Sequence, residues 1–180
     1  MGKVVVATVL LMLAAAGCSA IPADPDDTLE RVTGDVLRVG VSVNPPWTEL
    51  PHGTDEQEGG TEPEGTEVEL VADFAASLGA EVEWVIGGEE SLIDQLAEGD
   101  LDLVIGGLTA DSPWHEMAAL TWPYTESDDG GQVRRVMATP AGENAFLAAL
   151  EQFLAEQGQA QSEAQAQKRP QEQTQPRGPL

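Results

Sequence analysis

The sequence contains a single cysteine, Cys18, and this scarcity excludes an intramolecular disulfide bond. Basic residues are scarce as well, because 8 lysines and arginines stand against 32 aspartates and glutamates, and none occurs between Arg38 and Arg134. The net charge of −24 argues against nucleic acid or an anionic membrane as a partner. It indicates either a solubilising acidic surface or a field that repels anionic ligands and attracts cations.

A hydrophobic run long enough to span a bilayer is missing too. The uncharged run from Val4 to Ala16 falls short of the about 20 residues that a span needs. Lys3 precedes this run and a small-residue Ala-Gly-Cys site follows it, which is the layout of a secretory signal. The segment "LAAAGC" resembles a bacterial lipoprotein signal, with Ala15 where leucine is usual.

These features predict a signal peptide at 1–17, lipidation of Cys18, and a proline- and acid-rich tether at 18–35. Two or more acyl chains on Cys18 would anchor the protein firmly to a membrane. We therefore expect an extracytoplasmic protein of the cell envelope, in the periplasm or on the cell surface. An ordinary signal peptide with an incidental cysteine is the alternative.

Strand and helix patterns alternate in the middle of the chain. Three strands are predicted: a mostly apolar, valine-rich run at 36–43, an alternating strand at 81–86 and a third strand at 101–107. Two helices are predicted from apolar residues at helical spacing at 67–78 and 91–98, the second of them capped by Ser91. The β-α-β-α-β order favours right-handed crossovers and a parallel sheet.

The segments beyond the third strand predict one more helix start, one more strand and a long helix. Ser112 is a good N-cap, and Pro113 follows it at the first helical position. A returning strand is predicted at 132–140, and a helix with an apolar stripe at 142–157. The remaining residues, 158–180, are rich in glutamine and proline and are predicted to be disordered.

Four segments between Val36 and Tyr124 resemble the extracellular solute-binding protein family 3 of bacterial ABC importers. They read "LRVGVSVNPPW", "GTEVELVADFAASLG", "LIDQLAEGDLDLVIGGLT" and "LTWPYTES", in the family's order and spacing. Members of that family have two lobes that close on polar amino acids. The resemblance implies a ligand shelf at Trp47, polar ligand contacts at Thr109 and Ser112, and ABC importer membrane subunits as partners.

Two departures from the family pattern change the prediction. Trp114 or His115 stands where the family carries an arginine for the ligand's α-carboxylate, so we expect weak binding of ordinary α-amino acids. Only "TESDDGGQV" separates Tyr124 from the returning strand, whereas one β-α-β unit needs about 30 residues.

The predicted fold is therefore half of a periplasmic-binding-protein type II fold. It is an α/β, three-layer lobe at 36–157 with a mostly parallel sheet, built from the β-α-β-α-β unit, a returning strand and a C-terminal helix. A short turn at 126–132 stands in place of the second lobe.

Candidate ligand-binding residues lie at the carboxyl ends of the predicted strands, where open α/β sheets bind ligands. They are Trp47, Thr109, Asp111, Ser112 and Trp114. Asp111 would oppose a carboxylate, so a cationic or neutral polar solute is favoured over an anionic one. The alternative is structural, with Trp47 as a surface aromatic beside a turn and with Thr109, Asp111 and Ser112 as helix-capping residues.

Metal-binding and catalytic signals are weak. On a helix His115 could share a face with Asp111 and Ser112, but the other histidine, His52, lies in the acidic loop, and no nucleophile turn is present. A solvated histidine is the commoner case. The acidic loop at 48–66 is predicted to be mobile, and its carboxylates lack the spacing of a calcium loop. We predict no metal, no cofactor and no catalytic residue.

The favoured function is a non-enzymatic, lipid-anchored solute-binding domain with weak or altered ligand binding. The alternative is an accessory surface lipoprotein that uses its exposed former cleft for protein contact. A concave pocket with Thr109 and Ser112 pointing inward would favour the first, and an open apolar patch of Trp47, Trp114 and Trp122 the second. The resemblance also extends to some dehydratases of the same fold. Those enzymes work in a cleft between two lobes, so the missing lobe counts against an enzymatic function.

Overall fold

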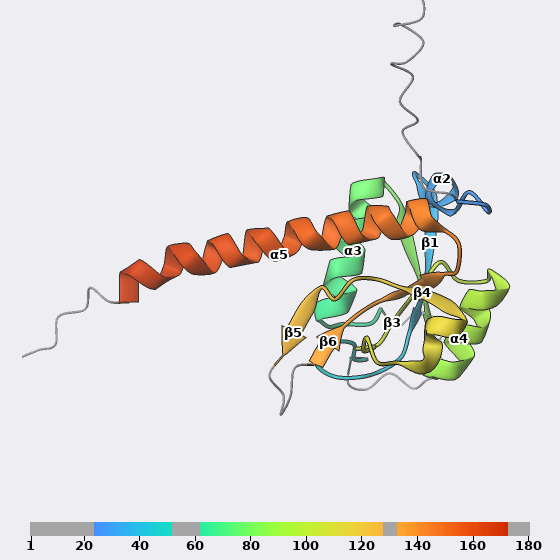
Figure 1. Cartoon of the computed structure of the whole chain (residues 1–180), viewed down its shortest axis with the longest axis horizontal. Coiled ribbons are helices and arrows are strands. Elements are labelled where there is room, and N and C mark those ends of the chain that lie inside the picture. The colour runs from blue at the N-terminus through green and yellow to red at the C-terminus, as the bar shows by residue number, and fades with distance from the viewer. Residues whose placement is uncertain (1–23, 52–61, 128–132, 173–180) are drawn as a thin grey trace, which may run out of the picture.

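The chain folds into a five-stranded sheet with helices on both faces (Figure 1). A computed structural model describes residues 24–51, 62–127 and 133–172. The strand order is β2-β1-β3-β7-β4, in which β1 runs parallel to β2 and β3, and β7 runs antiparallel to β3 and β4. The strands are β1 (Val36–Val41), β2 (Glu81–Ile86), β3 (Leu103–Ile105), β4 (Ala118–Leu120) and β7 (Ala138–Pro140). The predicted α/β lobe with a mostly parallel sheet is confirmed.

Helices form the two outer layers. On one face, α3 and the first part of α5 cover the sheet with the short α2 beside them, and α4 covers the other face (Figure 1). Leu103 and Ile105 point into the core under α3 and α5, whereas Val104 points into the core under α4, as alternation along a strand requires. The helices are α2 (Thr28–Val32), α3 (Thr66–Leu78), α4 (Glu89–Glu98) and α5 (Asn144–Glu172).

Close packing sets the position of both helix layers over the sheet. A Cβ atom at Gly40 would lie 2.8 Å from Leu101 Cδ1 and 3.1 Å from Leu92 Cδ2, so a larger residue in β1 would force these leucine side chains, the second of them on α4, to shift. On the opposite face, the rings of Phe74 and Phe146 meet edge to face with centroids 5.9 Å apart. This contact joins α3 to α5.

A buried ion pair, which the sequence did not reveal, ties the N-terminal segment to the sheet. The carboxylate of Asp102 is fully buried and lies 2.6 Å from Arg38 Nη2 and 2.7 Å from Arg31 Nη2. It also accepts the backbone N–H of Arg38 at 2.9 Å. Burial raises the pKa of the Asp102 carboxyl, but the hydrogen bonds from Arg38 and Arg31 outweigh burial and lower this pKa below its ordinary value.

The predicted cap of α4 and the predicted strand at 132–140 are wrong in detail. Gly88, in extended backbone conformation, is the N-cap of α4, and Ser91 lies inside the first turn. The strand divides into β6 (Val133–Arg135) and β7, because Val136 N–H bonds to Leu108 O and so leaves the ladder of β6. The chain thereby moves from one sheet to the other.

The hairpin of β5 (Thr125–Ser127) and β6 stands where the sequence predicted a turn in place of a second lobe. The two strands pair antiparallel, with Ser127 opposite Val133. Only residues 128–132 connect them, and these lie outside the described residues. The part of the chain that the structure describes thus forms one lobe.

The predicted tether at 18–35 is wrong for residues 24–35. Glu143 accepts the backbone N–H groups of Asp26 and Thr28, both at 3.1 Å, and Val32 is fully buried. These contacts fold the segment onto α5. Residues 1–23, which include the predicted signal peptide and Cys18, lie outside the described residues, as do residues 52–61 of the acidic loop.

The predicted disorder of 158–180 is wrong for residues 158–172. Helix α5 continues to Glu172 and projects away from the lobe (Figure 1). The low apolar content of this segment suggested disorder, but its alanine, glutamine and glutamate residues have high helix propensity. No helix among the described residues has both the length and the apolar character needed to cross a bilayer.

Candidate functional site

The candidate site lies at the carboxyl ends of β1 and β3, where an open α/β sheet presents ligands. After β1, the chain turns through 44–48, with Trp47 N–H bonded to Asn44 O at 3.0 Å. Thr48 is buried below this turn and donates its hydroxyl to Ser42 O at 2.5 Å. The turn therefore holds the half-buried Trp47 ring beside the end of β3.

Two glycines after β3 permit this close approach. Gly107 has φ +66°, and a Cβ atom there would lie 2.7 Å from both Asn44 Nδ2 and Trp47 Cδ1. The Asn44 side chain donates to Gly106 O at 2.8 Å. The Trp47 turn is thus fitted onto the Gly106–Gly107 backbone, which a larger residue would push away.

Glu67 connects this turn region to the rest of the lobe. Its side chain is fully buried at the start of α3, and Oε2 accepts the backbone N–H groups of Gly106 at 2.8 Å and Gly107 at 2.9 Å. Oε1 accepts the hydroxyl of Tyr124. Burial raises the pKa of the Glu67 carboxyl above its ordinary value. The hydrogen bonds from Tyr124 and the glycines lower this pKa, but they offset only part of the effect of burial.

Arg135 completes the site from strand β6. Its guanidinium carbon lies 4.8 Å from the centroid of the Trp47 ring, which is a cation–π contact. Nη1 donates to Gly107 O at 2.5 Å, and Nε is buried with no hydrogen-bond partner within the described part of the chain. The backbone of 134–136 runs antiparallel to 108–110, with Thr109 opposite Arg135, and this pairing fixes the arginine beside Gly107.

The structure brings only some of the predicted site residues together. Trp47 and Thr109 both lie against Arg135. Asp111 is 91% exposed at its side chain, with its carboxylate 3.6 Å from Arg134 Nη2. Asp111 therefore faces solvent and Arg134, the residue that precedes Arg135 on β6.

Ser112 and Trp114 have other partners. Ser112 is the N-cap of a short 3-10 helix (Pro113–Glu116), but its side chain makes no capping hydrogen bond. The indole N–H of Trp114 donates to Glu89 on α4 at 2.5 Å, and the ring packs against the core under that helix. His115 is exposed, and its Nδ1 lies 3.1 Å from Ser112 O. No cluster of metal-ligating side chains occurs among the described residues.

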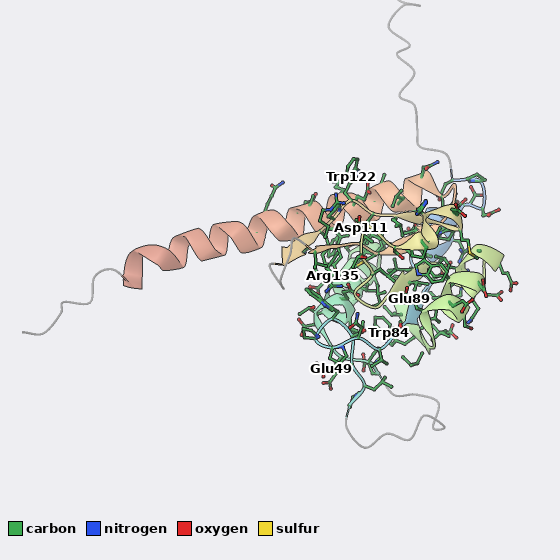
Figure 2. All side chains as sticks on the ribbon, turned by 60° about the horizontal axis from the view of Figure 1, so that its bottom comes forward. Glu49, Trp84, Glu89, Asp111, Trp122 and Arg135 are labelled. Carbon is green, nitrogen blue, oxygen red and sulfur yellow. The ribbon has the colours of Figure 1, made fainter. Side chains whose placement is uncertain are left out.

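The three tryptophans of the predicted apolar patch contact different elements. Trp47 contacts β6, and Trp114 contacts α4. Trp122 is 77% exposed, and its backbone N–H donates to Glu151 on α5 at 2.7 Å. Figure 2 shows Trp122 projecting beside α5, on the side of the molecule away from Glu49 and Trp84.

Two acidic cavities lie against α3, and one of them is lined by Trp47. One of about 340 Å³ lies between α3 and α5, beside Trp47 and Tyr124, and contains the carboxylates of Glu69 and Asp73. The other, of about 680 Å³, has four glutamates in its lining, Glu49, Glu62, Glu64 and Glu69. Among the described residues that line either cavity there is no lysine or arginine, so both attract cations.

Sequence reasoning missed Glu67 and Arg135. A glutamate directly after Gly-Thr at a helix start was a weak signal for Glu67, because the first turn of any helix favours acids. Arg135 belongs to the returning strand, and a search for basic residues close in sequence to Thr109 could not include it. Only the pairing of 134–136 with 108–110 brings it to Gly107.

Comparisons with known proteins identify a family and several structures with the same fold. Residues 37–169 match the sequence model of the bacterial extracellular solute-binding proteins, family 3. Among solved structures, an arginine-bound mutant of domain 1 from TmArgBP is 24% identical with a TM-score of 0.62, covering 74% of this chain and 98% of that chain. No curated protein matches the chain at a significant level.

Two further solved structures have the same fold. An arginine-bound, truncated arginine-binding protein from T. maritima is 16% identical with a TM-score of 0.58, covering 73% of this chain and 99% of that chain. An ancestral cyclohexadienyl dehydratase is 14% identical with a TM-score of 0.62, covering 79% and 94%. At these identities, the likeness establishes the fold of the lobe.

Proposed function

Because the chain belongs to the bacterial extracellular solute-binding proteins, family 3, we propose that it is a one-lobe solute-binding domain for a cationic or neutral polar solute. The solute would lie on the Trp47 face, beside Gly107 O and Thr109, with its tail toward the acidic cavity between α3 and α5. The function is binding, and no chemical step is assigned to these residues.

The observation that carries this proposal is the guanidinium held over Trp47. Arg135 lies 4.8 Å from the ring centroid and donates to Gly107 O, so an aromatic face and a carbonyl acceptor are already arranged around a cation. The acidic lining of the cavity beside Trp47 favours the same charge. Domain 1 from TmArgBP, which is similar to nearly all of this lobe, was crystallised in an arginine-bound form.

Binding is expected to be weak for ordinary α-amino acids. The position that carries the carboxylate-binding arginine in the family holds Trp114 or His115, and Trp114 is hydrogen-bonded to Glu89. A hydrogen bond to a charged group contributes about 1.5–3 kcal/mol, and tenfold in affinity corresponds to about 1.4 kcal/mol. A single lobe also leaves the solute open to water on one side, since flytrap closure needs two lobes.

The predicted anchor and partners belong to the same proposal. Lipidation of Cys18 would hold the lobe outside the membrane, and the membrane subunits of an ABC importer are the expected partner. Mass spectrometry of the protein from native membranes tests the anchor. A mature N-terminus other than lipidated Cys18 would contradict it.

Isothermal titration of the purified protein with L-arginine, L-lysine, L-glutamine and L-glutamate tests the solute class. We expect weak binding of arginine and lysine, which Trp47→Leu abolishes. Trp122→Leu is the matched control, because it removes an exposed tryptophan that contacts α5. Submicromolar affinity for glutamate would contradict the proposed solute class, and submicromolar affinity for glutamine would contradict the expected weak binding.

Protein contact is the second candidate function, and the exposed side chain of Trp122 favours it. A thermal-shift screen that stays flat for every solute, alongside a cooperative melt, would favour this candidate, because any bound solute stabilises by RT ln(1 + [L]/Kd). If the protein dehydrated prephenate and His115→Ala abolished this activity, the protein would be an enzyme. The ancestral dehydratase shares only its fold with this chain.

A further inference from the structure

We infer that Arg135 is the residue that determines which solutes the Trp47 face accepts, because it occupies the cation position there itself. A cationic solute must displace this side chain before it contacts Trp47 and Gly107. The inference rests on the proposed function, and it explains why the lobe as it stands should bind cations weakly.

The first argument is that Arg135 already makes the contacts that a cationic solute needs. Its guanidinium covers the Trp47 ring at 4.8 Å, and its Nη1 uses Gly107 O at 2.5 Å. The Gly107 backbone lies against the same indole, since a Cβ atom there would be 2.7 Å from Trp47 Cδ1. The guanidinium and an incoming cation would therefore compete for one ring face and one carbonyl.

The second argument concerns how firmly Arg135 is held. Its Nε is buried and has no hydrogen-bond partner within the described residues. A buried donor without a partner has lost its hydrogen bonds to water, so it destabilises the arrangement in which it is buried. Displacement of the side chain into water restores that hydrogen bond. Arg135 is thus a replaceable occupant of the site.

The third argument is that the surroundings favour a cation whichever molecule supplies it. The positive charge of Arg135 acts on the buried carboxyl of Glu67, which is hydrogen-bonded to the N–H of Gly107. A solute cation in the same place would experience the same carboxyl. Removal of the arginine charge therefore leaves the cation position beside that carboxyl open to a solute.

Arg134 provides a matched control on the same strand. Its side chain is 49% exposed and lies 3.6 Å from the carboxylate of the exposed Asp111, so it is not part of the Trp47 site. In the β5–β6 pairing, Arg134 is opposite Glu126 and Arg135 is opposite Thr125, and adjacent residues of a strand point to opposite faces. Replacement of either arginine removes one positive charge from the protein.

The experiment compares the wild-type protein with Arg135→Ala, Arg134→Ala and the double variant Arg135→Ala/Trp47→Leu. L-arginine and the methylguanidinium ion are the probes, titrated by calorimetry at constant ionic strength. We expect Arg135→Ala to bind L-arginine at least about tenfold more tightly than the wild type, a readily measured difference. Arg134→Ala should match the wild type, and the double variant should lose the gain.

Three results would overturn the inference. Equal affinity of Arg135→Ala and the wild type would show that Arg135 does not compete with the solute. Weaker binding by Arg135→Ala would make Arg135 a partner of the solute, and this result would leave the proposed function intact. An equal gain from Arg134→Ala would attribute the effect to net charge.

A second readout separates failure of this inference from failure of the proposed function. Methylguanidinium should raise the Tm of Arg135→Ala by more than that of the wild type, even if no amino acid binds to either protein. An unchanged Tm for the variant would overturn the inference. If Arg135→Ala does not fold, Arg135→Gln serves in its place, because it keeps a polar side chain and removes the charge and the guanidinium.

Discussion

Tyr124 donates its hydroxyl to the buried carboxylate of Glu67, which lies 57 positions earlier in the sequence. Glu67 lies in the first turn of α3, and Tyr124 immediately precedes the β5–β6 hairpin that stands in place of a second lobe. The same carboxylate accepts the N–H groups of Gly106 and Gly107 at the end of β3. One side chain therefore connects the first crossover helix, the central sheet and the start of the hairpin.

Replacement of Glu67 by alanine should strongly destabilise the lobe. The change leaves two glycine N–H groups and the Tyr124 hydroxyl without their acceptor, and each buried unsatisfied group costs about 1–3 kcal/mol. We expect a loss of about 3 kcal/mol or more in the free energy of urea unfolding. Glu69→Ala, on the exposed side of the same helix, is the control and should cost less than about 1 kcal/mol. Equal losses would contradict the role assigned to Glu67.

The raised pKa of Glu67 predicts a pH dependence of stability. Because the folded-state pKa lies above the ordinary value of 4.5, the folded protein binds this proton more tightly than the unfolded chain does. The resulting stabilisation is fully present below pH 4.5 and is lost as pH rises through the folded-state pKa. The stability of the wild type relative to Glu67→Gln, measured by urea unfolding, should fall as pH rises above 4.5. A difference that grows with pH would be evidence against this.

Asp102 should act in the opposite direction. Its pKa is lowered below the ordinary value of 3.8, so its stabilisation is present above pH 3.8 and is lost as pH falls through the folded-state pKa. Asp102→Asn breaks the pairs with Arg38 and Arg31, and we expect a loss of about 2 kcal/mol near neutral pH. This loss of stability is smaller than the loss expected for a fully buried ion pair, because the side chains of both arginines are partly exposed to water. Asp100→Asn, an exposed neighbour, should leave the urea midpoint unchanged.

Gly107→Ala should displace the Trp47 turn. The new Cβ atom would lie 2.7 Å from Asn44 Nδ2 and Trp47 Cδ1, at a φ of +66° that alanine rarely adopts. Gly99→Ala is the matched control, because Gly99 also has positive φ but has no atom within 4 Å of the added Cβ. The control isolates a backbone cost of about 1–2 kcal/mol, and Gly107→Ala should exceed it by about 1–3 kcal/mol of overpacking. A shift in tryptophan emission should accompany Gly107→Ala alone.

Local patterns were sufficient to predict most of the elements. The valine-rich run of β1, the apolar stripe of α3 and the glycine ends of α3 and α4 depend on residues a few positions apart, which carry their signal in the sequence. The predictions failed where a local tendency competed with a distant contact. Residues 24–35 have the composition of a tether, but Glu143 accepts the N–H groups of Asp26 and Thr28 and holds the segment against the lobe. Residues 132–140 have the pattern of one strand, but the hydrogen bond from Val136 N–H to Leu108 O divides it in two.

The sequence by itself determined the family, the crossover order of the sheet and the brevity of the link between Tyr124 and the returning strand, because each is a property of consecutive residues. The tertiary structure alone decided which residues come together in the site. Arg135 reaches Trp47 only through the pairing of the returning strand with 108–110, and Glu67 reaches Gly106 only because α3 packs on the sheet face that carries the side chains of Leu103 and Ile105. Such contacts join residues that no local period relates, so they arise only when the sheet and its helices have assembled.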